Sequence, residues 1–132
     1  MDPDKLRDDL ARHVRRRAMF VRNIPRGATV LTSLPDAADL ALDCVCYPLA
    51  VEDLSRGLAD MEERRAAAQL LLGTELDLGT GVALLRHYRT AAIWVRGRQA
   101  RKLAKIYGPV VAREEKSGRN RILVLDLARV EP

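Results

Sequence analysis

The stretch TAAIWVRGRQARKLAKIYGPVVAREEKSGRNRILVLDL, residues 90–127, predicts most of the fold of this 132-residue chain. Its first part, 90–95, is short, apolar and rich in β-branched residues, which indicates a strand. The next part, 98–107, lies between two glycines and has the apolar spacing of a helix. Two apolar runs then flank a polar, basic loop and predict a β-hairpin, with strands over 110–115 and 121–129 and the loop over 116–120.

The flanking segments add further helices and strands. We expect helices over about 3–18, with an apolar face formed by Leu6, Leu10 and Val14, and over 82–88, and a strand over 28–33. Residues 40–47 fit both helical and strand spacing, and we predict a strand because Cys, Val and Tyr favour one. The fold class is therefore a single α+β domain over 1–132, a small, largely antiparallel sheet packed by amphipathic helices and ending in the C-terminal hairpin.

A long helix over 51–72 carries an apolar seam in which only Arg65 interrupts the alternating steps of three and four residues. Such a seam is typical of a helix buried against a sheet. The alternative is a homodimer that forms through the 51–72 helix.

Composition narrows the setting in which the protein works. No apolar run is long enough for a membrane span, and the polar start MDPDKLRDDL shows no secretory signal, so we expect a cytoplasmic protein without membrane contact. Cys44 and Cys46 are then expected to be two small buried thiols in a reducing cytosol. Arg greatly outnumbers Lys, and Asn and Gln are scarce, which favours a thermophile; a GC-rich genome is the alternative source of the arginine excess.

The chain offers no catalytic motif or metal-ligand set. Its two cysteines and two histidines lack zinc-site spacing, and it contains no P-loop, dinucleotide fingerprint or nucleophile elbow. We therefore expect neither an enzyme nor a bound cofactor or metal.

The charges are segregated along the sequence. Residues 27–85 are strongly acidic, whereas the N-terminal segment 1–26 and above all 86–121 are strongly basic. Cations gathered in this way are what a surface that binds a polyanion requires. The alternative is a basic segment that only balances the acidic one.

The helix over 98–107 separates its charged and apolar residues. Arg98, Arg101, Lys102 and Lys105 form one stripe, and an apolar stripe lies about 200° away at 100° per residue. We expect this row of four cations to contact phosphates.

Alternation along a strand over 90–96 places Trp94 on the same face as Arg96. Because Ile93 and Val95 already supply a buried face, we expect Trp94 to be at least partly exposed. An exposed ring beside a cation can stack on a base of a single strand. Other aromatic residues also lie close to basic ones. The complete set of candidate nucleic-acid-binding residues is Arg15, Arg16, Arg17, Phe20, Arg86, Arg89, Trp94, Arg96, Arg98, Arg101, Lys102, Lys105, Lys116, Arg119 and Arg121.

Two resemblances bear on function. The order of a basic helix over 98–107 followed by a hairpin resembles a winged helix-turn-helix domain, in which 98–107 would be the recognition helix and 116–121 the wing. The whole chain resembles the crenarchaeal single-stranded DNA-binding proteins called ThermoDBP. The residues that carry this second resemblance are Arg15, Arg16, Arg17, Phe20, Trp94 and Arg96. It implies an archaeal protein with a hydrophobic cleft edged by basic residues and non-specific binding of single strands.

The predicted function is the binding of single-stranded nucleic acid, DNA rather than RNA, with low sequence specificity through phosphate contacts and aromatic stacking. RNA remains an alternative ligand. A winged-helix regulator of duplex DNA is the second hypothesis. A protein-interaction module, with the acidic helix 51–72 bound to a basic partner, is the third.

Overall fold

A computed structural model describes residues 2–51, 60–73 and 75–130. Its helices are α1 (Pro3–Asn23), α2 (Ala37–Asp43), α3 (Met61–Leu72), α4 (Leu78–His87) and α5 (Gly97–Tyr107). Its strands are β1 (Thr29–Leu31), β2 (Tyr47–Pro48), β3 (Thr90–Arg96), β4 (Val111–Ser117) and β5 (Asn120–Leu125).

The strands form one five-stranded sheet in the order β2-β1-β3-β5-β4. The short strand β1 runs parallel to β2 and β3, whereas β3, β5 and β4 are antiparallel neighbours. The sheet is therefore mixed, and its longer pairings are antiparallel. The predicted α+β class is confirmed, as are the strand before α5 and the hairpin after it.

The winged-helix alternative is wrong for this fold. A helix-turn-helix needs two helices joined by a short turn, but the central strand β3 separates α4 from α5. Helix α5 lies against the sheet, in contact with β3 and β5, and its buried residues Leu103 and Tyr107 belong to the core of the domain.

The prediction of a strand over 40–47 is also wrong. Residues Ala37–Asp43 form α2, and only Tyr47–Pro48 pair as a strand. Ala37 and Leu40, which are three residues apart, are buried on one face of α2. The segment therefore folds as its helical spacing indicates, although its composition favours a strand.

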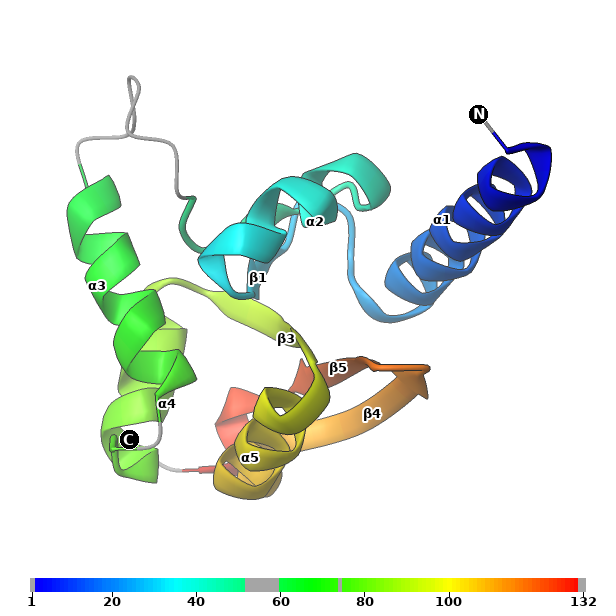
Figure 1. Cartoon of the computed structure of the whole chain (residues 1–132). Coiled ribbons are helices and arrows are strands. Elements are labelled where there is room, and N and C mark those ends of the chain that lie inside the picture. The colour runs from blue at the N-terminus through cyan, green and yellow to red at the C-terminus, as the bar shows by residue number, and fades with distance from the viewer. Residues whose placement is uncertain (1, 52–59, 74, 131–132) are drawn as a thin grey trace.

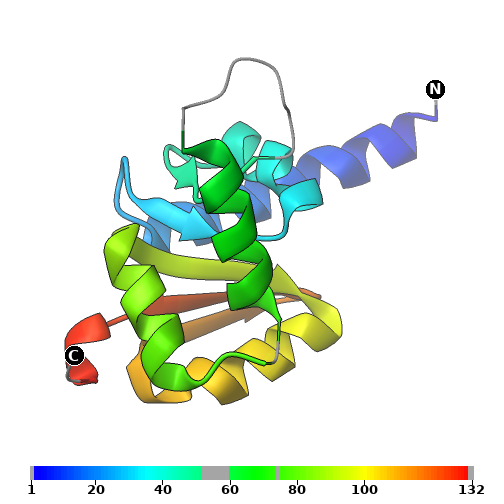
Figure 2. The same ribbon diagram turned by 90° about the vertical axis from the view of Figure 1, so that its left-hand side faces the viewer.

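The sheet is covered on both faces. Helices α3, α4 and α5 pack on one face, around Leu31, Leu71, Leu85, Ile93 and Leu103. The last turns of α1, together with α2, cover the other face around Met19, Phe20, Leu40, Trp94 and Ile122. The first turns of α1 project away from the body, so the N-terminal end lies far from the sheet (Figures 1 and 2).

Three further predictions about helices need qualification. Helix α1 extends beyond residue 18 to Asn23, and its predicted apolar face of Leu6, Leu10 and Val14 is exposed. In the predicted helix 51–72, residues 52–59 lie outside the described part, and Met61, Ala68 and Leu71 are buried against the sheet. A homodimer through α3 could therefore use only its outer face, where Leu70 is exposed.

The expectation of two free thiols is wrong, because Cys44 and Cys46 are joined in a disulfide. The bond closes a small ring across one residue, directly after α2 ends at Asp43. Extended backbone at Cys44 ends the helix and brings the two sulfurs to the same side.

Trp94 is buried, contrary to the prediction that it is exposed. Its exposed fraction is 0%, and the ring of Phe20 meets it edge-on at a centroid distance of 5.1 Å. The Nε1–H donates to Asn120 Oδ1 at 3.1 Å. The alternation along β3 was predicted correctly, but residues distant in the sequence cover the face that holds Trp94.

Because Trp94 fills the core beneath α1, Trp94→Ala should lower the free energy of unfolding by about 3–5 kcal/mol, as truncation of a buried aromatic does. Urea unfolding followed by circular dichroism measures this loss. Trp94→Phe keeps most of the packing and loses the hydrogen bond, so we expect a smaller loss. An alanine variant as stable as the unaltered chain would contradict this description of the core.

Candidate nucleic-acid interface

The turn of the β4–β5 hairpin is built from two residues, Gly118 and Arg119, between the paired Ser117 and Asn120. Gly118 has φ +60°, a left-handed conformation that a type II′ turn requires at its first position. Gly97 also has φ +61°, and its N–H donates to the carbonyl oxygen of Arg119 at 3.0 Å. The two glycines thereby hold the basic turn against the start of α5.

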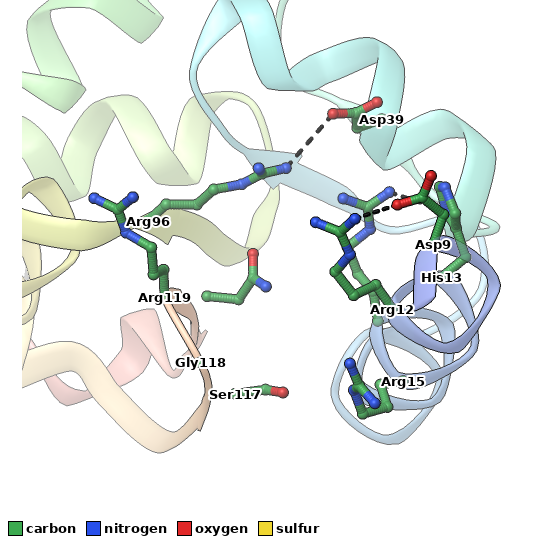
Figure 3. Close-up of a pocket in the computed structure, with 11 residues that line it drawn as sticks. Asp9, Arg12, His13, Arg15, Asp39, Arg96, Ser117, Gly118 and Arg119 are labelled. Carbon is green, nitrogen blue, oxygen red and sulfur yellow. Dashed lines mark hydrogen bonds and ion pairs between the residues drawn. The ribbon is translucent and has the colours of Figure 1, made fainter. Parts of the chain in front are cut away.

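A cleft of about 730 Å³ lies between α1 and this turn, and Figure 3 shows its side chains. We call it the first cleft. Five arginines but only two aspartates line it, so it is strongly positive. Its lining residues are Asp9, Arg12, His13, Arg15, Arg16, Asp39, Arg96, Ser117, Gly118, Arg119 and Asn120.

Two arginines of the first cleft rest on the ring of Trp94. The guanidinium of Arg96 lies 4.8 Å from the ring centroid and that of Arg16 lies 5.7 Å away. Sharing a strand face with Arg96 therefore does not keep Trp94 open to solvent. Instead, the cation–π contact lets the two guanidiniums cover the indole.

Arg96 is held in place but keeps unused hydrogen-bond donors. Its Nη2 lies 3.5 Å from carboxylate oxygens of both Asp36 and Asp39. Its Nε and Nη2 are buried and have no hydrogen-bond partner among the described residues. The side chain as a whole is 37% exposed, on the side that lines the cleft. The part of this cation that is exposed at the cleft wall can attract an anionic ligand.

The carboxylate of Asp43 fixes α1 to α2 at the edge of the first cleft. Arg16 Nε donates to Asp43 Oδ2 at 2.6 Å, and His13 Nδ1 lies 3.1 Å from the same oxygen. Burial raises the pKa of Asp43, but the hydrogen bonds from His13 and Arg16 outweigh burial and leave the pKa below its usual range.

A second tether holds the other end of α1 to β4. Arg22 Nη2 donates to Glu115 Oε2 at 2.6 Å, and Asn23 Nδ2 donates to Glu115 Oε1 at 3.0 Å. These hydrogen bonds lower the pKa of Glu115 from its usual value. Together, Asp43 and Glu115 set the direction of α1 and hence the width of the first cleft.

A second cleft of about 340 Å³ lies on the other side of the hairpin turn. Its lining residues are Gly97, Arg98, Ala100, Arg101, Lys116, Gly118, Arg119, Asn120 and Arg121, and every charged one is basic. It includes the first turn of α5, whose N–H groups have no side-chain cap. The two clefts share Gly118, Arg119 and Asn120, so they form one basic band around the turn.

The structure brings together about half of the predicted site residues. Those in the basic band are Arg15, Arg16, Arg96, Arg98, Arg101, Lys116, Arg119 and Arg121. Arg17, Lys102 and Lys105 are exposed but line neither cleft.

Four other candidates are used elsewhere. Phe20 and Trp94 are buried and cannot stack on a base from the surface. Arg86 donates to the backbone carbonyls of Leu127 and Val130 and so secures the C-terminal segment. Arg89 lies in the turn before β3 with φ 52°, at the other end of that strand from Arg96.

Arg12 lines the first cleft but was not among the predicted site residues. The signal was present in the sequence, because Arg12, Arg15 and Arg16 follow the i, i+3, i+4 spacing of one helix face. Arg12 also pairs with Asp9 within α1.

Comparisons with protein-family models, curated proteins and solved structures gave no match. The resemblance to ThermoDBP therefore stays a prediction. No helix among the described residues is long and apolar enough to cross a membrane. Within the same residues, no cluster of His, Cys, Asp and Glu could hold a metal ion.

We expect Asp43→Asn to lower the free energy of unfolding by about 3 kcal/mol at neutral pH, because it leaves the buried end of Arg16 without its counter-charge. Asp9→Asn is the matched control, since the Asp9–Arg12 pair is exposed and should contribute less than about 1 kcal/mol. Urea unfolding measures both. Equal losses in the two variants would contradict the role of Asp43 as a tether.

The same carboxylates predict a pH dependence. Because the folded-state pKa of Asp43 and Glu115 is lowered, their contribution is complete above the unfolded value of about 4 and is lost as pH falls through the folded-state pKa. We therefore expect stability to fall as the pH drops below about 4, and to fall less steeply in Asp43→Asn. Urea midpoints over a pH series measure it, and parallel curves would refute the assignment.

Proposed function

We propose that this protein binds single-stranded nucleic acid, DNA in preference to RNA, with low sequence specificity and without catalysing a reaction on it. The observation that carries the proposal is the basic band, in which cations far outnumber acidic residues in two adjoining clefts on either side of one hairpin turn. Phosphate is the ligand common to every nucleotide, so contacts of this kind do not read sequence.

The types of side chain support a polyanion as ligand. The arginines of the band present planar forks that match phosphate oxygens, and the side chain of Arg96 is partly exposed at the wall. The uncapped first turn of α5 adds N–H groups beside Arg98 and Arg101. Several such positions along one band fit a chain of phosphates better than a single small anion.

A single strand fits this surface better than a duplex. The two clefts lie on either side of the hairpin turn and share its residues, so a ligand that reaches both must bend around the turn. Trp94 and Phe20 supply no stacking surface, since both are buried. Bases can stack on arginine guanidinium planes instead, and Arg12, Arg15 and Arg119 are exposed at the first cleft.

We also propose that the protein works in the cytoplasm of a thermophilic archaeon. The excess of Arg over Lys and the scarcity of Asn and Gln support a thermophile. The Cys44–Cys46 disulfide agrees with this setting, because intracellular proteins of hyperthermophiles retain disulfides that a mesophilic cytosol would reduce.

The test is fluorescence anisotropy with matched single-stranded DNA, RNA and duplex oligonucleotides. A variant with Arg98→Gln, Arg101→Gln and Arg119→Gln removes three exposed cations of the band. Each phosphate contact is worth about fivefold in affinity at 0.1 M salt, so we expect a loss of roughly 100-fold for the single strand.

The matched control carries Arg17→Gln, Lys102→Gln and Lys105→Gln, which remove the same charge from exposed positions outside both clefts. We expect this control to bind nearly as tightly as the unaltered chain. Equal losses of affinity in both triple variants would show that binding depends on net charge and not on the band. Tighter binding of the duplex than of the single strand would overturn the preference for single strands.

Salt dependence gives an independent measure. If four to eight cations contact phosphates, log K should fall against log salt with a slope between about −3 and −6, at about −0.7 per phosphate of a single strand. The band variant should flatten this slope by about 2. A slope near zero in the unaltered chain would leave the proposal without its electrostatic basis.

A further inference from the structure

The second cleft gathers five cations around a small volume. Among the described residues, no acidic side chain lines this cleft, and its volume of about 340 Å³ is less than half that of the first cleft. Only Arg121 has a carboxylate nearby, with its Nε 3.4 Å from Glu114 Oε1, and the other four form no ion pair within the described part of the chain. The five cations are Arg98, Arg101, Lys116, Arg119 and Arg121.

Two of these cations oppose each other directly across the hairpin. Lys116 of β4 and Arg121 of β5 are paired in register, and both line the second cleft, so their side chains lie on the same face of the sheet. Like charges directly opposite each other on neighbouring antiparallel strands destabilise a sheet. The hairpin therefore carries a repulsion that a bound anion would relieve.

The start of α5 adds a second repulsion at the same place. A helix N-terminus carries a partial positive charge and favours acidic residues in its first turn. The first turn of α5 has neither an acidic residue nor a side-chain cap, and it contains Arg98. Arg119 lies close to it as well, because its Nη2 is 3.7 Å from the position that a Cβ on Gly97 would occupy. Here too a bound anion would relieve the repulsion.

The chemistry of phosphate groups decides which anion suits this cleft best. Each internal phosphate of a strand carries one negative charge and has the chain on both sides of it. A terminal phosphate carries a charge of about −1.5 to −2 at neutral pH, presents three acceptor oxygens and has the chain on one side only. The helix start, the facing pair and the turn supply cations from three elements around a small volume. A terminal phosphate therefore matches the second cleft better than an internal one.

We propose, on the basis of the nucleic-acid binding proposed above, that the second cleft binds a terminal phosphate group and the first cleft binds internal phosphates of the same strand. Arg98 and the N–H groups of the α5 start contact this group from the helix. Lys116 and Arg121 contact it from the sheet. Arg119 lines both clefts and so joins the end of the strand to the nucleotides that follow. A free mononucleotide carries the same phosphate monoester and is the other source of this chemistry.

The first experiment is fluorescence anisotropy of the full chain with an internally labelled single strand of about ten nucleotides. The strand is prepared with a 5′-phosphate, with a 3′-phosphate, or with hydroxyl groups at both ends. At about pH 8 and about 0.1 M salt, one of the two phosphorylated strands should bind at least about fivefold more tightly than the hydroxyl-ended strand.

A charge-matched strand separates recognition of the end from attraction to added charge. A hydroxyl-ended strand that is two nucleotides longer carries about the same total charge as the phosphorylated strand. The shorter, phosphorylated strand should still bind more tightly. Equal affinities of these two strands would overturn the proposal, because binding would then follow total charge.

A competition assay distinguishes the two sources of the phosphate monoester. If free nucleotides also occupy the second cleft, an unlabelled mononucleotide should lower the affinity for the phosphorylated strand to that of the hydroxyl-ended strand. If the cleft takes only strand ends, the mononucleotide should leave the difference between the two strands unchanged.

Lys116→Gln tests the facing pair. It should reduce the ratio of affinities between the phosphorylated and hydroxyl-ended strands to below about twofold. Arg15→Gln is the matched control, because it removes an exposed cation that lines the first cleft only. It should weaken the binding of both strands equally and leave their ratio unchanged. The same fall of the ratio in both variants would overturn the assignment of the terminal phosphate to the second cleft.

The stability of the free chain gives a readout that does not depend on any ligand. Because Lys116→Gln relieves the repulsion with Arg121, the variant should unfold at a urea concentration no lower than that of the unaltered chain. A lower midpoint would contradict the repulsion on which the proposal rests.

Failure of this proposal and failure of the proposed function give different results. A chain that binds phosphorylated and hydroxyl-ended strands equally still binds single strands, and this result overturns only the terminal-phosphate site. A chain that binds none of the strands overturns both.

Discussion

The burial of Trp94 is the constraint on which the rest of this structure depends. Its ring occupies the centre of the sheet face that α1 and α2 cover, in edge contact with Phe20. Its N–H reaches Asn120 at the hairpin turn. Arg16 and Arg96 close over the ring. One side chain thus joins the sheet, the long helix, the hairpin and the wall of the first cleft.

This arrangement explains how arginines can lie so close together. Part of the acidic middle of the chain lies within the basic region, because Asp36, Asp39 and Asp43 lie beside the two arginines nearest the indole. These carboxylates balance the inner charges, and the exposed arginines further out keep theirs. A positive field therefore remains at the mouth of the cleft, where a polyanion would arrive.

Local signals in the sequence predicted most of the C-terminal half. Glycines around α5 and the alternation along β3 depend on neighbouring residues only, and both were predicted correctly. The failures arose where distant segments meet. The exposure of Trp94 depends on Phe20, which is 74 residues away in sequence, and periodicity within one strand holds no information about it. Nothing near Arg86 in the sequence distinguishes it from a surface cation, because the carbonyl oxygens to which it donates belong to Leu127 and Val130, far along the chain.

The same reasoning applies to the candidate site. The basic stripe of α5 was predicted from the spacing of its residues. Only its first half, Arg98 and Arg101, lies beside the hairpin turn in the second cleft. Lys102 and Lys105 continue the stripe away from that turn. Sequence spacing can show that cations share a helix face, but only the tertiary position of Gly118 and Arg119 determines which of them lie at one cleft.

The two sides of helix α1 differ in character. The side that faces the body carries Arg16, which Asp43 anchors, and the outer side carries leucines and valines that are exposed among the described residues. An ion pair that is buried at the base of a helix costs desolvation. The buried ion pair between Arg16 and Asp43 is explained if α1 must be held in place as the wall of the first cleft.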